Sequence, residues 1–230
     1  MRRHLATVNA RWDNESSVLL GDYLFTHAFH LASTLDKVIA CRLIGRATNI
    51  VCEGELKQKG SRGNYNLSEV EYLDIIEGKT AELTAVSCRL GAIFAGASPK
   101  IADELDGFGR DLGIAFQIAD DLLDVLGEEQ TTGKSLGTDL VKQKPTLPLI
   151  RALEVATPRD RAELLELLTG DTPRPAELAP LLERYDAVGY SRRVAESYAT
   201  RACNRLTILK PSASSDVLAT MADFVVSRAT

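Results

Sequence analysis

Three aspartates lie in the middle of a long apolar stretch, at a spacing that suits binding of a divalent cation. Asp120 and Asp124 are one helical turn apart, so on a helix their carboxylates point the same way, and Asp121 flanks them. Gln117 falls on the same polar stripe. Mg²⁺ prefers one or two carboxylates, several waters and substrate phosphate oxygens. The stripe therefore predicts a diphosphate substrate carried by magnesium.

The alternative is an acidic patch on a solvated helix face, since most aspartates in proteins are exposed. Both sides of the stripe are strongly apolar, however, which is typical of a buried helix. Carboxylates buried there without a counter-charge would cost roughly several kcal/mol. We therefore favour the cation site. The apolar flanks are Ile114, Ala115, Phe116, Ile118, Leu122, Leu123, Val125 and Leu126.

Basic side chains that could bind the oxygens of a diphosphate occur at several separated places. Two stand at the front of the chain, one precedes Thr80 at a predicted helix start, and two lie in the loop after the aspartates. Lys and Arg donate charge-assisted hydrogen bonds to phosphate oxygens. These residues are Arg2, Arg3, Lys79, Lys134 and Lys144.

The segment from residue 127 to 148 is long, charged and rich in glycine. Structureless loops of this length are uncommon in compact domains unless they have a function. We expect residues 128–144 to be mobile without ligand and to close over the acidic stripe when a diphosphate binds. A solvated surface loop is the alternative.

The elements that must position these residues are helices. Apolar residues recur at helical spacing along the whole chain, with no strand alternation, repeat or domain linker. Ser68 and Glu71 form a predicted capping box, which starts a helix. We expect Gly78 to end that helix. We expect one all-α domain over residues 1–230, a multi-helix bundle. The predicted helices are 12–32, 36–59, 68–77, 79–96, 101–126, 145–156, 159–169, 175–188, 190–208 and 213–228.

Small or polar residues form a stripe on the helix predicted at 79–96, at Thr80, Thr84, Ser87 and Gly91. Such a stripe is typical of close helix–helix packing, and it also suits the wall of a cavity. The sequence of this helix alone favours neither interpretation.

Composition excludes several classes of protein. The 230 residues include 27 basic and 32 acidic side chains, a net charge of −5 that indicates no nucleic-acid partner. The four scattered cysteines form no CxxC pair, so we interpret them as buried thiols in a reducing cytosol. The most apolar stretch, 18–32, contains Asp22, His27 and His30, so we expect no membrane span. Polar and charged residues such as Arg2, Arg3 and Asp13 interrupt any apolar run at the front of the chain, so we expect no signal peptide. The two histidines lack a third metal ligand, so we interpret them as packing or surface residues.

Several ordered motifs resemble those of the trans-polyprenyl diphosphate synthases, the isoprenyl diphosphate synthase family, long-chain type. The resemblance covers nearly the whole chain at consistent spacing. Its motifs are Phe116-Gln117-Ile118-Ala119-Asp120-Asp121-Leu122-Leu123-Asp124, Gly133-Lys134-Ser135-Leu136-Gly137-Thr138-Asp139-Leu140, Lys144-Pro145-Thr146-Leu147-Pro148, Leu20-Gly21-Asp22-Tyr23-Leu24, Gly54-Glu55-Leu56-Lys57-Gln58 and Lys79-Thr80-Ala81.

The resemblance implies the isoprenoid synthase fold and a magnesium-dependent prenyl transfer. An allylic diphosphate would ionise, the double bond of isopentenyl diphosphate would attack the carbocation, and a proton would leave. Asp120, Asp121 and Asp124 are implied as magnesium ligands, and Lys79, Gln117 and Lys134 as catalytic groups. The implied substrate-binding residues are Arg2, Arg3, Lys79, Thr80, Gln117, Lys134 and Lys144.

The family's first aspartate-rich motif has no match in the 230 residues, where Asp120-Asp121 is the only Asp-Asp pair. Arg2 and Arg3 resemble the arginines that follow that motif, so we expect an N-terminally shortened member of the family. We expect the exposed apolar faces to be buried in a homodimer. We expect the 230-residue chain alone to have little or no condensation activity, because one aspartate motif cannot hold the full magnesium cluster that neutralises the leaving diphosphate. Two further interpretations stay open: a non-catalytic chain or partner subunit of the same fold, and a terpene cyclase.

Overall fold

The computed structural model describes residues 6–126, 138–170 and 174–228, and all regular structure in these ranges is helical. This confirms the all-α prediction, while a single domain over residues 1–230 stays a prediction. The helices are α1 Val8–Arg11, α2 Asn14–Ser33, α3 Ile39–Gly60, α4 Glu69–Ile76, the π-helix η1 Glu77–Ala81, α5 Glu82–Phe94, α6 Pro99–Leu126, α8 Thr138–Val141, α9 Leu147–Val155, α10 Pro158–Thr169, α11 Pro175–Arg184, α12 Ala187–Arg205, the 3₁₀ helix η2 Leu206–Ile208 and α13 Ala213–Ser227.

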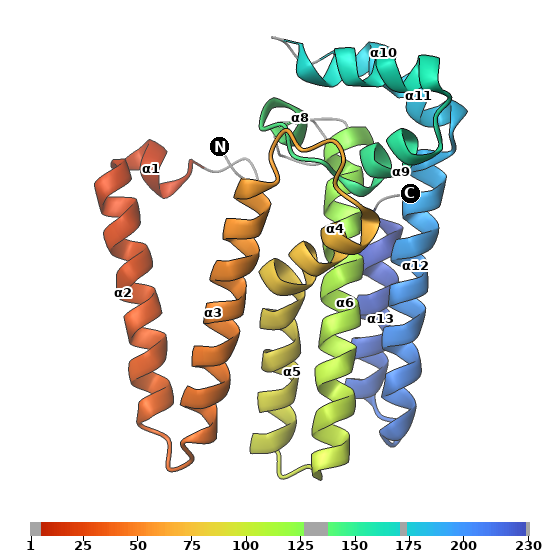
Figure 1. Ribbon diagram of the computed structural model, residues 1–230. Helices are drawn as coiled ribbons and strands as arrows, with labels where there is room; N and C mark the ends of the chain where they lie inside the picture. The colour runs from red at the N-terminus through yellow and green to blue at the C-terminus, as the bar shows by residue number, and fades with distance from the viewer. Residues whose placement is uncertain (1–5, 127–137, 171–173, 229–230) are drawn as a thin grey trace.

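The long helices α2, α3, α5, α6, α12 and α13 run side by side along one axis, and α8 to α11 gather at one end of them (Figure 1). Helix α6 lies in the centre of the bundle and packs mainly against α5 and α12. Its apolar face is buried in the main core, where Phe108, Ile118 and Leu122 are at most 1 % exposed. A second buried cluster, which includes Leu149, Leu164 and Leu182, joins α9, α10 and α11 at that end. Helix α6 is therefore a rigid support for any side chain that it carries.

The predicted helix end at Gly78 is wrong. The capping box is present, with Ser68 accepting from the Glu71 amide and the Glu71 carboxylate accepting from Ser68, so α4 begins where predicted. After α4 the chain continues directly into η1, which contains Gly78, and on into α5 without a break. A single glycine weakens a helix by only about 1 kcal/mol, and tertiary packing outweighs that cost here.

The predicted break at Gly189 also lies elsewhere. Helix α11 ends at Arg184 and α12 begins at Ala187, because Asp186 has a positive φ of 48° that interrupts the helix. Gly189 lies inside α12, where a β-carbon would come within 2.1 Å of the Asp186 carboxylate. The glycine therefore makes room for the turn instead of ending the helix.

Helix α2 stands at the edge of the bundle, beside α3 (Figure 1). Of its 20 residues only Ala32 is buried, and Val18, Leu19, Tyr23 and Leu24 are each about three-fifths exposed. In the described part of the chain, no helix is both long enough and apolar enough to cross a bilayer.

Candidate active site

Helix α6 separates the three predicted metal ligands. On this helix, Ile118, Ala119 and Leu122 next to the aspartates are fully buried, so their face of the helix points into the core. Asp121 is 1 % exposed and points into the bundle, whereas Asp120 and Asp124 are only partly buried. Consecutive residues on a helix are about 100° apart, so with Asp121 in the centre of the buried face Asp120 and Asp124 lie toward its edge. The aspartates are therefore not equivalent.

The buried carboxylate of Asp121 is held by three donors. The Tyr72 hydroxyl donates to Oδ2 at 2.8 Å, and the Gln117 side-chain amide donates to Oδ1 at 2.8 Å. The Lys144 ammonium forms an ion pair with Oδ1 at 2.8 Å and another with Asp139 at 2.9 Å. Burying a carboxylate is costly unless it is paired and hydrogen-bonded, and here both conditions are met.

Burial and charge act in opposite directions on these groups. Burial raises the pKa of Asp121 above its ordinary value, and the charge of Lys144 partly opposes that rise. Burial lowers the pKa of Lys144, but Asp121 and Asp139 outweigh it and the net direction is upward. Burial, together with the adjacent Asp121, raises the pKa of Tyr72 well above its ordinary value, so its hydroxyl keeps its proton. The cluster is thus a tyrosine donor and an ammonium around one carboxylate.

Lys144 reaches back to the aspartates, as the sequence led us to expect of the loop lysines. Lys144 is only 8 % exposed, and its ammonium lies between the carboxylates of Asp121 and Asp139. Phosphate binding by Lys144, which stays a prediction, would require it to leave one of them. The backbone N–H of Asp139 donates to Asp124 Oδ2 at 2.9 Å, so α8 is tied to the end of α6.

Lys79 and Thr80 meet the site from η1. Thr80 donates to the side-chain oxygen of Gln117 at 2.8 Å, and Gln117 in turn donates to Asp121. The Lys79 ammonium donates to Gln58 on α3 at 2.6 Å and lies 3.6 Å from Glu55. Thr80, Gln117, Asp121 and Lys144 therefore form one continuous chain of polar contacts, with Lys79 beside it.

Close backbone approach holds η1 between two helices. A β-carbon on Gly54 of α3 would lie 2.5 Å from the Lys79 backbone nitrogen, and one on Gly113 of α6 would lie 2.5 Å from the Ala81 α-carbon. Single π-turns within helices are frequent at functional sites. These two glycines allow η1 to lie close enough for its side chains to reach Gln58 and Gln117.

Close packing of α5 against α6 decides, at one position, between the two interpretations of the stripe of small residues. A β-carbon on Gly109 of α6 would come within 2.5 Å of the Thr84 carbonyl oxygen, so Thr84 lies at a close helix–helix contact. Ser87 and Gly91 are exposed instead. At Thr84, the close-packing interpretation is confirmed.

We expect Gly54→Ala to weaken diphosphate binding as well as the fold. The added methyl would force η1 away from α3, and such overpacking costs about 1–3 kcal/mol. Urea unfolding and magnesium-dependent diphosphate titration would measure both effects. Gly60→Ala, on the same helix with nothing within 4 Å of the added carbon, is the matched control. Equal results for both variants would contradict the packing argument.

The structure brings together no group of three or more His, Cys, Asp or Glu side chains suited to a metal among the described residues. Asp121 is taken up by Lys144, Tyr72 and Gln117. Asp120 and Asp124 remain one turn apart on the partly exposed side of α6. Two carboxylates fit Mg²⁺ when substrate phosphates and water complete its coordination.

Some predicted residues lie outside the described residues, namely Arg2, Arg3 and Lys134, as does most of the loop expected to close over the site. His27 and His30 lie exposed on α2, which confirms their interpretation as surface residues. Sequence reasoning missed Tyr72, Gln58 and Asp139 as members of the polar cluster. Gln58 and Asp139 lie within the motifs that resemble the family's, so their signal was present in the sequence. Tyr72 lies in none of those motifs, and only the fold brings it to Asp121.

Comparison with known proteins identifies relatives along the whole chain. The polyprenyl synthetase family matches residues 1–185. A short chain isoprenyl diphosphate synthase of Methanothermobacter thermautotrophicus is 36% identical over 234 residues, 99% of this chain and 72% of that protein. The octaprenyl diphosphate synthase of Escherichia coli is 34% identical, over 99% of this chain and 71% of that protein. The crystal structure of a decaprenyl diphosphate synthase from Rhodobacter capsulatus superposes with a TM-score of 0.92 at 33% identity, covering 100% of this chain and 72% of that one.

Proposed function

Because the chain belongs to the polyprenyl synthetase family, we propose that it condenses an allylic prenyl diphosphate with isopentenyl diphosphate to lengthen an isoprenoid chain. The observation that carries this proposal for the chain's own residues is the arrangement on α6. Asp120 and Asp124 share its partly exposed side, next to the polar chain that links Thr80, Gln117 and Asp121.

The reaction needs a site that stabilises a leaving diphosphate. Mg²⁺ held by Asp120 and Asp124 would supply positive charge to that group when bound. Lys79 would neutralise further phosphate oxygens, and Thr80 and Gln117 would orient them by hydrogen bonds. The allylic C–O bond breaks with its electron pair going to the diphosphate. The double bond of isopentenyl diphosphate then forms the new C–C bond, and a proton is lost to restore a double bond.

Two alternatives stay open beside this function. One is a non-catalytic chain or partner subunit of the same fold. A terpene cyclase would share the metal chemistry, but the Lys79-Thr80 motif favours a synthase.

Incubation with farnesyl diphosphate, labelled isopentenyl diphosphate and Mg²⁺ tests the proposal. Label in an extractable longer prenyl product, absent after chelation of the metal, would support condensation by this chain itself. Magnesium-dependent diphosphate binding without label transfer would support the partner-dependent alternative. If the chain neither binds diphosphate nor transfers label, the proposed function is contradicted.

We further propose that the chain forms a homodimer through α2. A large exposed apolar patch is typical of an association site, and α2 exposes Val18, Leu19, Tyr23 and Leu24 together. Sedimentation equilibrium should give twice the monomer mass of 25.0 kDa. The variant Leu24→Glu should shift the chain toward the monomer, whereas Val217→Glu, equally exposed but on α13, should not. A wild-type monomer would contradict this proposal.

The state of the four cysteines indicates in which cellular compartment the protein is located. All four are free thiols, but the prediction that they are buried is wrong, since Cys52 is exposed and Cys41, Cys88 and Cys203 are only partly buried. Disulfides are rare in reducing compartments such as the cytosol. We therefore propose a cytoplasmic location, which fractionation of cells that produce the native protein would test.

A further inference from the structure

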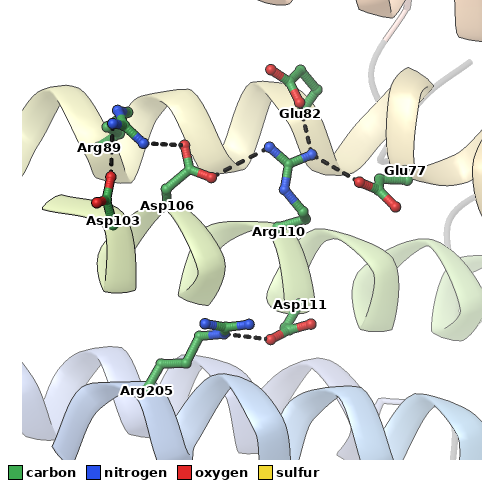
Figure 2. Close-up of polar contacts among 8 residues, drawn as sticks. All are labelled: Glu77, Glu82, Arg89, Asp103, Asp106, Arg110, Asp111 and Arg205. Carbon is green, nitrogen blue, oxygen red and sulfur yellow. Dashed lines mark hydrogen bonds and ion pairs between the residues drawn. The ribbon is translucent and has the colours of Figure 1, made fainter. Parts of the chain in front are cut away.

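Arg110 on α6 lies at the centre of a cluster of carboxylates on α5, α6 and η1 (Figure 2). Its Nη1 lies 3.0 Å from Glu77 Oε1 and 2.7 Å from Glu82 Oε2, and its Nη2 lies 3.3 Å from Asp106. The Arg110 side chain is 29% exposed and that of Glu82 13%, so the cluster is partly desolvated. One nitrogen of Arg110 thus binds two carboxylates at once.

These two carboxylates mark the two ends of the π-turn. Glu77 is the first residue of η1, and Glu82 is the first residue after it. In an α-helix, residues five apart lie about 140° from each other around the axis, which would point the two side chains in different directions. A π-turn closes instead with i→i+5 bonds, and here the Glu82 N–H donates to the Glu77 carbonyl. Only the π-geometry places both carboxylates within reach of one guanidinium nitrogen.

The same turn carries Lys79 and Thr80 to their partners. Lys79 reaches Gln58 on α3 and Thr80 reaches Gln117 on α6, two helical turns beyond Arg110. If the turn relaxed to an α-helix, the residues on one side of it would rotate by about 100° relative to those on the other. Lys79 and Thr80 would then no longer face both partners together.

We propose that Arg110 is a positioning residue, which selects the π-turn by binding the carboxylates at its two ends and so holds Lys79 and Thr80 toward the diphosphate. Its effect on the turn is independent of any ligand. Its effect on binding rests on the proposed function. An isolated exposed ion pair would contribute little, but here three carboxylates from two helices and the π-turn share one guanidinium.

Arg89 offers a matched control. It also joins α5 to α6, through Asp103 at 2.8 Å and Asp106 at 3.6 Å, and its side chain is 33% exposed. It lies two helical turns beyond Glu82, and its ion pairs within the described part of the chain are with α6 and not with η1 (Figure 2). Arg89→Gln therefore removes a similar cross-link without touching the π-turn.

Hydrogen–deuterium exchange tests the effect on the turn. In Arg110→Gln we expect amide exchange across residues 77–84 to accelerate at least tenfold, because the i→i+5 bonds lose the contact that selects them. In Arg89→Gln this segment should keep the wild-type rate. If Arg110→Gln fails to fold, Glu77→Gln removes one end of the clamp with less disturbance and should show the same local effect. Equal exchange in the Arg110 and Arg89 variants would overturn the proposal.

Calorimetry with inorganic diphosphate and Mg²⁺ tests the effect on binding. We expect the Kd of Arg110→Gln to rise about tenfold, a change of about 1.4 kcal/mol. Arg89→Gln should stay within about twofold of wild type. If wild type binds but both variants bind equally well, Arg110 does not position the site. If wild type itself does not bind, the proposed function fails, and the exchange experiment alone decides the role of Arg110.

Discussion

Replacing Lys144 by methionine is expected to destabilise the fold by about 3–5 kcal/mol, the range typical of removing one partner from a buried ion pair. The Lys144 ammonium lies 2.8 Å from Asp121 and 2.9 Å from Asp139. Without it, the carboxylate of Asp121 keeps only the Tyr72 and Gln117 donors in a site where it is 1 % exposed. Urea unfolding monitored by circular dichroism would measure the loss.

Lys57→Met is the control for this variant. Lys57 pairs with Asp74 at 2.6 Å, but both side chains are more than half exposed, so water and salt screen the pair. The unfolding midpoint of Lys57→Met should therefore stay close to that of wild type. Equal losses in the two lysine variants would show that burial does not make the Lys144 pair special.

The loss should depend on pH. Burial already raises the pKa of Asp121, and removing Lys144 removes a charge that opposes this rise. A carboxyl whose pKa is higher folded than unfolded binds its proton more tightly in the folded state, so protonation favours folding. The deficit of Lys144→Met should be complete above the raised pKa and shrink as the pH falls toward the unfolded value of about 3.9. A deficit that grows on acidification would contradict this account.

Replacing Asp120 and Asp124 together by alanine should abolish magnesium-dependent diphosphate binding, with a loss of about a hundredfold or more in Kd. Mg²⁺ binds diphosphate oxygens and water readily, but it needs protein carboxylates to hold it at the site. Because both aspartates are only partly buried, the main core of α6 should tolerate the change, although the hydrogen bond from the Asp139 N–H to Asp124 is lost. Titration of inorganic diphosphate with and without Mg²⁺ in a calorimeter would measure the effect.

Asp103→Ala is the matched control, since Asp103 lies on the same helix and pairs with Arg89 far from the aspartate motif. Its diphosphate affinity should equal that of wild type. If the double variant also binds normally, the stripe is an ordinary acidic patch. If the double variant unfolds, the diphosphate affinities of the single variants Asp120→Asn and Asp124→Asn still show what each carboxylate contributes to binding.

The sequence by itself determined the local elements. The 3.6-residue apolar period predicted the long helices, and the capping box at Ser68 predicted the start of α4, because both depend on contacts within a few residues. The motifs also pointed to the family, since their order and spacing are properties of the chain alone. The same resemblance predicted Lys79, Thr80, Gln117, Asp121 and Lys144 as residues of one site, and their roles in binding or catalysis stay predictions.

Only the tertiary structure decided what those residues do to one another. Three aspartates looked alike in sequence, but the packing of α6 buries Asp121 against Lys144, 23 residues away, and leaves Asp120 and Asp124 on another side. The turn at Gly78 looked like a helix end, but α3 and α6 hold it as a π-turn by close backbone contact. Pairing of buried charges and selection among helical turns depend on neighbours brought close by folding. No local pattern records those neighbours.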